Sequence, residues 1–270
     1  MTMPLHVDAA PRPPLPWYRP VGPELDVFEH CYHNRLPLML KGPTGCGKSR
    51  FVEHMAARLQ RPLITVSAHD DTSAVDLLGR YIVQGGETAW QDGPVTRAVR
   101  QGAILYVDEV AEARSDVVVV LHPLTDHRRR LFVERHDEEL IAPEGFMLVV
   151  SFNPGYQHSL KEMKPSTRQR FVGLSFHYPS PEVELEVLVG ETGCTPAVGK
   201  RLVALAGKVR AIDHLGLAEA PSTRLLVDAA RLIGSGLPAR LACRVGVVEP
   251  LTDDREIAQA LQDLVHLVFD

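Results

Sequence analysis

The stretch Gly42–Ser49 has residue types and spacing that suit the binding of phosphate groups. It matches the pattern G-x-x-x-x-G-K-[ST], in which glycines let a loop fold round an anion with its backbone N–H groups pointing inward. A helix that follows such a loop adds its positive N-terminal end. Lys48 can then reach the β- and γ-phosphates of a nucleotide, and the Ser49 hydroxyl can ligate Mg²⁺. The loop consists of Gly42, Pro43, Thr44, Gly45, Cys46, Gly47, Lys48 and Ser49.

Two adjacent carboxylates, Asp108 and Glu109, form a second stretch that suits phosphate chemistry. They follow directly after the apolar run 103–107, which reads as a buried strand. In an open α/β sheet, ligands bind beyond the carboxyl ends of the strands. We therefore expect Asp108 to hold Mg²⁺ through its water shell, and Glu109 to orient and deprotonate an attacking water. ATP and Mg²⁺ are the expected cofactors.

Four further polar side chains are candidates for the same site. Asn153 follows the apolar run 146–152, so its amide can bond the γ-phosphate or the water, or can simply begin a turn. Arg168 and Arg170 stand two positions apart on a predicted short helix, so at most one of them should face a given site. Arg224 lies in the first turn of a predicted helix, where the helix dipole disfavours a cation, which indicates an anion nearby.

The apolar pattern predicts an α/β fold, with a parallel sheet sandwiched by helices. The run 36–40 directly before the phosphate-binding loop reads as a buried strand, and residues 50–59 after it have apolar side chains at helical spacing. This strand–loop–helix context supports the loop motif. Further strands are predicted at 63–66, 103–107, 146–152 and 174–176.

Two β-hairpins are predicted in places where a bare nucleotide-hydrolysing core needs none. The first, 81–90, contains the pair Gly85-Gly86, and the second covers 131–141. Trp90, at the end of the first hairpin, can anchor it in the core or contact a partner. Asp92-Gly93-Pro94 follows Trp90 closely and leads the chain rigidly back into a helix, which favours anchoring. We therefore expect partner contacts nearer the tip of the hairpin, 84–87.

The chain divides into three predicted regions. Residues 1–16 are rich in proline and predict a flexible arm. Residues 17–179 form the α/β core, and Pro179-Ser180-Pro181 marks a boundary. Residues 180–270 predict an all-helical lid domain, with helical apolar spacing at 182–189, 198–209, 222–233 and 256–269.

Composition narrows the class of protein. The 270 residues are 45% hydrophobic and 23% charged, which favours a packed core. The net charge of −5 argues against nucleic acid as the main partner. No apolar run approaches the ~20 residues of a membrane span, and no signal peptide is recognised at the start. The four cysteines show no pairing or metal spacing, so we expect a reduced, cytoplasmic protein.

These features, in this order, resemble an AAA+ ATPase of the MoxR branch. The resemblance to AAA+ ATPases is carried by the loop, the carboxylate pair, Asn153, the arginine pair and a helical lid with Arg224. The resemblance to the MoxR branch is carried by the two hairpins. Within that branch, the chain is similar to the CbbQ/NorQ/GvpN group, and most of all to its CbbQ members. The matching stretches are Tyr18–Glu24 (YRPVGPE), Leu40–Ser49 (LKGPTGCGKS), Leu78–Tyr81 (LGRY), Trp90–Pro94 (WQDGP), Val119–Arg129 (VVLHPLTDHRR) and Ser151–Gln157 (SFNPGYQ).

The resemblance implies an ATP-hydrolysing ring, commonly a hexamer, with ATP at subunit interfaces. It implies that Asn153 is the first sensor of the nucleotide and Arg224 the second. Arg170 corresponds to the arginine finger that reaches a neighbouring subunit's γ-phosphate, with Arg168 as the alternative. The hairpins are implied to face the pore or one face of the ring, where they grip a partner.

The family also implies a target protein. Members of the MoxR branch work with an adaptor that carries a von Willebrand A domain. The CbbQ members, with a CbbO-like adaptor, activate Rubisco by releasing inhibitory sugar phosphates, and this is the first expectation. Relatives of the NorQ type help mature nitric oxide reductase instead. An assembly scaffold of the GvpN type is the third possibility, and Glu109 argues against it because a scaffold does not need a water-activating carboxylate.

Overall fold

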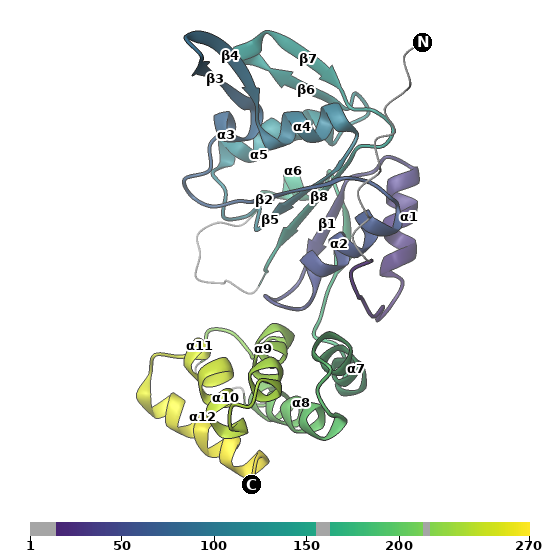
Figure 1. Cartoon of the computed structure of the whole chain (residues 1–270). Helices are drawn as coiled ribbons and strands as arrows, with labels where there is room; N and C mark the ends of the chain where they lie inside the picture. Colours follow the sequence, from purple (N-terminus) through teal and green to yellow (C-terminus); the bar gives the residue numbers. More distant parts are fainter. Residues whose placement is uncertain (1–14, 155–162, 213–216) are drawn as a thin grey trace, which may run out of the picture.

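The computed structural model describes residues 15–154, 163–212 and 217–270, which form an α/β part and a helical part (Figure 1). Most of the predicted arm, 1–14, and residues 155–157 of the last matching stretch lie outside the described residues. The strands are β1 Leu38–Lys41, β2 Leu63–Ser67, β3 Gly79–Gln84, β4 Glu87–Asp92, β5 Ile104–Asp108, β6 Arg130–Val133, β7 Glu138–Ile141, β8 Met147–Phe152 and β9 Val172–Ser175. The helices of the α/β part are α1 Glu24–His33, α2 Lys48–Arg58, α3 Ala74–Leu78, α4 Pro94–Gln101, α5 Ser115–Leu121 and α6 Pro165–Arg168.

In the described part of the chain, five parallel strands form one sheet in the order β2-β5-β8-β1-β9. Because β8 lies between β5 and β1, the carboxyl ends of these three strands are neighbours. The phosphate-binding loop follows β1, Asp108 ends β5, and Asn153 follows β8. The sheet therefore brings the candidate residues to one edge, and the predicted fold class is confirmed.

Each face of the sheet is covered by helices, because strand side chains alternate between the two faces. In β5, Ile104 and Tyr106 pack into the hydrophobic cluster that contains residues of α1 and α2. Leu105 and Val107 pack into the other cluster, with residues of α3, α4 and α5. This arrangement fixes the ends of β5 and β1 on which the candidate site depends.

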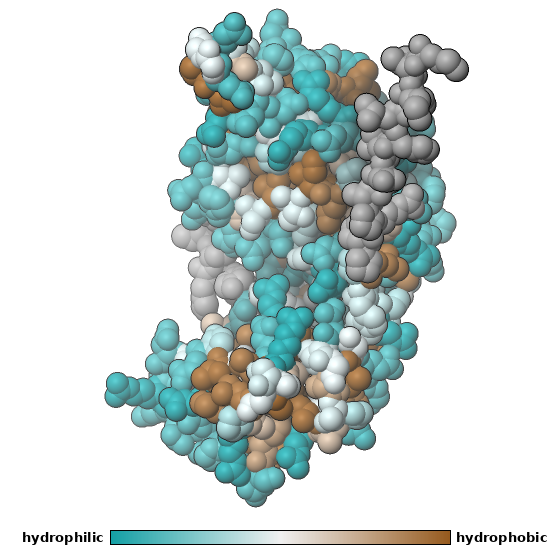
Figure 2. Space-filling model, in the orientation of Figure 1, coloured by the Kyte–Doolittle hydropathy of each residue, from teal (hydrophilic) through white to brown (hydrophobic). Residues whose placement is uncertain are grey.

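Both predicted hairpins are present. In the β3–β4 hairpin, Gln84 pairs with Glu87 around Gly85 and Gly86, whose φ angles of 62° and 88° suit a two-residue hairpin turn. In the other hairpin, Arg130 pairs with Ile141. Figure 1 shows both at the end of the α/β part that is remote from the helical part. Figure 2 shows hydrophobic atoms among hydrophilic ones at that end.

The helical part has a hydrophobic cluster of its own, to which all four predicted helices contribute. Its helices are α7 Pro181–Thr192, α8 Pro196–Arg210, α9 Thr223–Gly234, α10 Ala239–Cys243, α11 Glu249–Leu251 and α12 Arg255–Val268, with a π-helical turn at Arg244–Val248. The segment from α10 to α11 was not predicted. No helix in the described residues is long and apolar enough to cross a membrane.

Candidate active site

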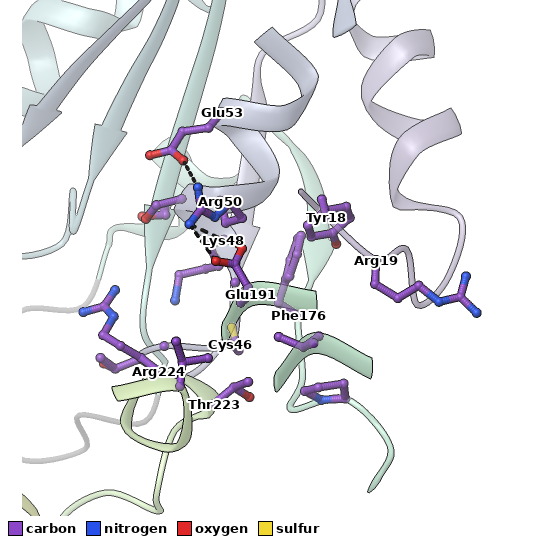
Figure 3. A pocket seen from close by; sticks show the side chains of 18 of the residues that line it. Tyr18, Arg19, Cys46, Lys48, Arg50, Glu53, Phe176, Glu191, Thr223 and Arg224 are labelled. Carbon is purple, nitrogen blue, oxygen red and sulfur yellow. Dashed lines mark hydrogen bonds and ion pairs between the residues drawn. The ribbon is translucent and has the colours of Figure 1, made fainter. Parts of the chain in front are cut away.

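A cavity of about 570 Å³ lies between the phosphate-binding loop and the helical part. Its walls combine the ends of the central strands with the segment before α1 and with α9 of the helical part. Tyr18 of the segment before α1, Lys48 at the start of α2 and Arg224 in the first turn of α9 all line this cavity (Figure 3). The volume suits a ligand of the size of a nucleotide.

The glycines of the loop are needed for its shape. Gly45 and Gly47 have φ angles of 67° and 99°, which side chains rarely adopt. A Cβ atom on Gly45 would lie 2.6 Å from the side chain of Ser222, and one on Gly42 would lie 2.5 Å from the carbonyl oxygen of Phe176. The loop therefore leaves no room for side chains at Gly42 and Gly45, and Gly47 leads directly into the N-terminus of α2.

Lys48 folds back over the loop that precedes it. Its Nζ atom donates hydrogen bonds of 2.8 Å to the carbonyl oxygens of Gly42 and Pro43. The ammonium group thus lies on the loop, where the N-terminus of α2 and the loop's own N–H groups also favour an anion. An ammonium group held at this place can contact a phosphate that the loop binds.

Asp108 is oriented by hydroxyl groups from two strands. The Tyr106 hydroxyl donates to Oδ1 of Asp108 over 2.8 Å, and the Ser151 hydroxyl donates to the same oxygen. The other oxygen, Oδ2, accepts a 3.1 Å hydrogen bond from the Ser49 hydroxyl. Burial raises the pKa of the Tyr106 hydroxyl above its ordinary value, and the Asp108 carboxylate raises it further, so this phenol stays a proton donor.

This donor set fits Mg²⁺ bound together with phosphate groups. Mg²⁺ usually keeps several waters and takes only one or two protein oxygens beside the substrate phosphates. Ser49 and Asp108 offer one hydroxyl and one carboxylate at the same point. Within the described residues, no group of three or more His, Cys, Asp or Glu side chains could hold a metal ion by itself.

Glu109 has a strained backbone and a carboxyl group beside the loop. Its φ angle is 55°, an uncommon value for this residue type, and its N–H group donates to Asp108 Oδ1 and to Ser151 Oγ over 3.2 and 3.3 Å. Partial burial raises the pKa of the Glu109 carboxyl, with repulsion from Asp108 as a second cause, while the charges of Lys48 and Arg224 lower it. A carboxylate of raised basicity at this place suits proton abstraction.

Asn153 meets the phosphate-binding loop and, unexpectedly, a carboxylate from the helical part. Its Nδ2 atom lies 3.3 Å from Thr44 Oγ1 and donates to Glu219 Oε1 over 3.1 Å. The Thr44 hydroxyl donates to the same Glu219 oxygen over 3.1 Å. Glu219 was not among the predicted site residues, because the sequence before α9 carries no motif that marks it.

Arg224 is exposed in the first turn of α9 and lines the cavity beside the loop. A Cβ atom on Gly45 would lie 3.3 Å from Arg224 Cβ, so the start of α9 contacts the loop directly. Ser222, the N-cap of α9, is buried at the same contact. Arg224 thus lies beside the loop for which the sequence predicts phosphate binding, and an anion near Arg224 stays a prediction.

A buried ion pair holds the start of α9 in place. Arg210 donates two hydrogen bonds of 2.8 Å to the carboxylate of Glu184, of which only 1% is exposed. Arg210 also donates to the carbonyl oxygen of Pro221, and the Thr223 hydroxyl donates to Glu184 over 2.7 Å. The guanidinium lies 4.3 Å from the ring centre of Tyr178. This network, which sequence reasoning missed, positions both Ser222 and Arg224.

Both parts of the chain match known protein families. Residues 37–171 match the family model of an AAA domain of the dynein-related subfamily, and residues 184–268 match the C-terminal region of CbbQ, NirQ and NorQ. The denitrification regulatory protein NirQ of Pseudomonas aeruginosa is 55% identical over 95% of this chain and 98% of its own. Protein NorQ of Paracoccus denitrificans is 56% identical over 94% of each chain. Protein CbbQ of Hydrogenophilus thermoluteolus is 50% identical over 94% of this chain and 95% of its own.

The chain belongs to the CbbQ/NirQ/NorQ family of AAA+ ATPases. The resemblance inferred from the motifs is thus confirmed, and the chain is an ATP-hydrolysing enzyme. Among solved structures, NtrX from Brucella abortus has a TM-score of 0.53 at 19% identity, covering 77% of this chain and 49% of its own. That likeness supports the fold alone.

The two candidate finger residues of this family member lie away from the cavity. Among the described residues that line it, neither Arg168 nor Arg170 is present. The sequence predicted that Arg168 and Arg170 lie on one short helix. Helix α6 ends at Arg168, however, so Arg170 lies beyond it. Arg168 is half-buried and donates to the Met163 carbonyl oxygen over 2.9 Å, whereas Arg170 is exposed. Of the three candidate arginines, Arg224 is the one that lines the cavity of this chain.

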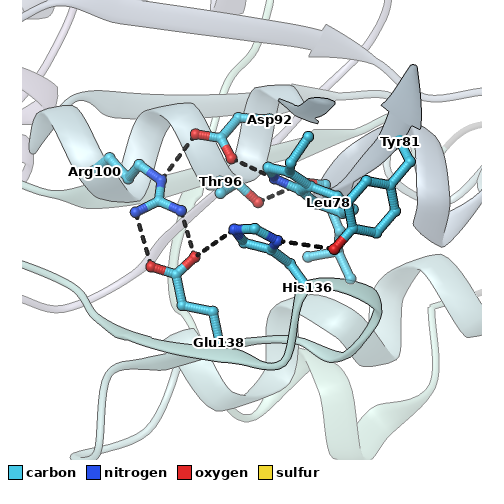
Figure 4. Close-up of polar contacts among 8 residues, drawn as sticks. Leu78, Tyr81, Asp92, Thr96, Arg100, His136 and Glu138 are labelled. Carbon is cyan, nitrogen blue, oxygen red and sulfur yellow. Dashed lines mark hydrogen bonds and ion pairs between the residues drawn. The ribbon is translucent and has the colours of Figure 1, made fainter. Parts of the chain in front are cut away.

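The two hairpins of this family member are joined by side chains (Figure 4). The ring of Trp90 stacks on His136, with centroids 4.8 Å apart and planes 8° apart, and its Nε1 atom donates to Asp92 over 2.7 Å. Arg100 of α4 pairs with Asp92 and with Glu138 of the second hairpin. Trp90 also packs against the core, so the anchoring alternative is confirmed. The tip, 84–87, is exposed.

Proposed function

We propose that the chain is the ATPase subunit of a ring-shaped motor that remodels a partner protein. The observation that carries this proposal is the meeting of Lys48, Glu109 and Arg224 around one cavity, with the phosphate-binding loop on one side and the helical part on the other. A site closed by two parts of the chain can convert a change in its ligand into a movement of one part against the other.

The residues of this cavity have distinct proposed roles. Bound ATP supplies the terminal phosphoanhydride bond that is hydrolysed. Lys48 and the N–H groups of Gly42–Ser49 bind the phosphates, while Ser49 and Asp108 hold Mg²⁺, with Asp108 acting through water. Glu109 accepts a proton from the attacking water. Asn153 bonds the terminal phosphate or that water, and Arg224 binds phosphate from the lid.

The exposed position of Arg170 supports a role in a neighbouring subunit's site. An arginine that lies off its own cavity can stabilise charge in the next one when subunits form a closed ring. We assign Arg170 as this finger in a hexameric ring, with Arg168 as the alternative. Arg168 is the weaker candidate because its Nε atom is already held by the Met163 carbonyl.

The hairpins supply the proposed contact with other proteins. Val83 is 79% exposed beside the tip 84–87, at the end of the molecule remote from the helical part. The rigid link through Trp90 and His136 lets force on the tip reach α4 and the sheet. A von Willebrand A-domain adaptor is the proposed binding partner, through which the motor acts on its target enzyme.

The family relationships order the candidate targets. The identities of 55% to NirQ and 56% to NorQ slightly exceed the 50% to CbbQ, over nearly equal lengths. We therefore place the maturation of nitric oxide reductase in denitrification first, and Rubisco activation with a CbbO-like adaptor second. This reverses the order expected from the sequence motifs. An assembly scaffold is disfavoured because Glu109 is retained beside the metal-binding pair.

A reconstitution with both targets tests this proposal. The purified chain is combined with the adaptor and ATP, and is offered inactive nitric oxide reductase or sugar-phosphate-inhibited Rubisco. We expect ATP-dependent recovery of reductase activity, and none with Lys48→Ala, which cannot bind the phosphates. Recovery of Rubisco alone would assign the second target, and recovery of neither would contradict the proposal.

A further inference from the structure

Glu219 places a negative charge against Thr44 and Asn153, two of the residues that line the cavity. Its Oε1 atom accepts hydrogen bonds from Thr44 of the phosphate-binding loop and from Asn153 at the end of β8, each over 3.1 Å. These two donors come from the loop and from the strand end that surround bound phosphates in this fold. Glu219 itself belongs to the segment between α8 and α9 of the helical part.

The segment that carries Glu219 is held by Arg210 of the helical part and by Tyr178, which lies between β9 and α7. The Tyr178 hydroxyl donates to the carbonyl oxygens of Thr44 and Ala220, over 3.2 and 3.4 Å. Arg210 donates to the carbonyl of Pro221 and pairs with buried Glu184. The position of Glu219 therefore moves with the start of α9, on which Arg224 lies.

A carboxylate and a terminal phosphate cannot use these donors together. Both are anions that need the Asn153 amide, and two like charges in one partly buried site destabilise each other. Asn153 is the residue proposed above to bond the terminal phosphate of ATP, a phosphate that ADP lacks. Glu219 would thus oppose ATP and leave ADP nearly unaffected.

We propose that Glu219 occupies the terminal-phosphate position when that phosphate is absent, and so lowers the affinity for ATP relative to ADP. Binding of ATP then has to displace Glu219 from Thr44 and Asn153, which moves the start of the lid. After hydrolysis and phosphate release, Glu219 returns to the same donors. This inference rests on the nucleotide site proposed above and is independent of the target protein.

Two variants of Glu219 test this role in the full chain. Glu219→Gln keeps the size and hydrogen-bonding oxygen but removes the charge, and Glu219→Ala removes both. Glu256→Gln removes one charge from an exposed position of α12, a helix that contributes no residue to the cavity, and is the matched control. Calorimetric titration with Mg²⁺·ADP and with the hydrolysis-resistant analogue Mg²⁺·AMP-PNP gives both affinities.

We expect both Glu219 variants to bind AMP-PNP about tenfold more tightly, the change that corresponds to one charged contact, with ADP affinity altered less than about twofold. The control should change neither affinity. An unchanged or weaker affinity for AMP-PNP, or an equal gain for ADP, would overturn the inference. If the unaltered chain bound neither nucleotide, the nucleotide site itself would be wrong, which is a distinct result.

Discussion

Trp90 of the first hairpin lies flat on His136 of the second, with ring planes only 8° apart. The two residues are 46 positions apart in the chain (136 − 90): Trp90 lies in β4, and His136 lies in the 3-10 turn that joins β6 and β7. Tyr81 adds an edge contact to Trp90 and a 3.3 Å hydrogen bond to His136. The hairpins therefore behave as one joined unit on α4, and not as two independent inserts.

Removal of this contact should loosen the hairpins without touching the nucleotide site. His136→Ala is expected to lower the free energy of unfolding by about 1 kcal/mol, the usual worth of an aromatic pair. It should also raise amide hydrogen exchange in β3 and β4. His136→Phe keeps a flat ring and should restore protection. Equal exchange in all three proteins would contradict the proposed joint.

Partner contact at the first hairpin's tip is testable by shortening it. Replacement of 84–87 by a two-residue Gly-Gly turn should keep basal ATPase activity and ring size, because the tip is exposed and remote from the cavity. It should abolish activation of the target enzyme. If activation survives, the tip does not couple ATP hydrolysis to the target, and the second hairpin becomes the candidate.

The buried ion pair of the lid predicts a large loss of stability. Glu184→Gln leaves the Arg210 guanidinium half-buried without its carboxylate, and breaking such a pair costs about 3–5 kcal/mol. Glu182→Gln, on the exposed side of the same helix, is the matched control and should change little. Urea unfolding curves of the two variants measure the difference. Similar curves would show that Glu184 does not hold the lid.

Much of the fold could be predicted because its signals are local. The loop motif between an apolar run and a helical pattern and the Gly85-Gly86 turn each depend on a few neighbouring residues. The segment α10–α11 was missed because its helices are short and a glycine, Gly246, interrupts the apolar pattern. Strand β9 begins at Val172, two residues before the predicted start, because Gly173 weakens the strand signal.

The parts of the site that were missed depend on contacts between distant segments. Glu219 meets Asn153 from 66 positions away, and only the packing of the lid on the loop brings them together. Tyr106 and Ser151 lie in apolar strands, where nothing local shows that both hydroxyl groups turn toward Asp108. A polar side chain in a buried strand beside a candidate metal-binding carboxylate was the signal that could have indicated them.

The trans role of Arg170 can be separated from that of Arg168 by mixing subunits. Arg170→Ala and Lys48→Ala rings should each be inactive alone, because every interface lacks one essential group. Mixed rings contain some interfaces with an intact Lys48 and an intact Arg170, so ATPase activity should return in part. Full activity of Arg170→Ala alone, with Arg168→Ala inactive, would transfer the role to Arg168.

The most direct test of the account is ATP hydrolysis by Glu109→Gln. The substitution removes the proton-accepting carboxylate and leaves Lys48, Ser49 and Asp108 in place. Single-turnover hydrolysis and ATP binding are measured on the same preparation, with Glu112→Gln as the control for loss of a nearby charge. The account predicts that ATP affinity is retained and that hydrolysis falls by at least about a hundredfold, as for loss of a general base. Hydrolysis at the rate of the unaltered protein would contradict the assignment of Glu109 and with it the proposed site.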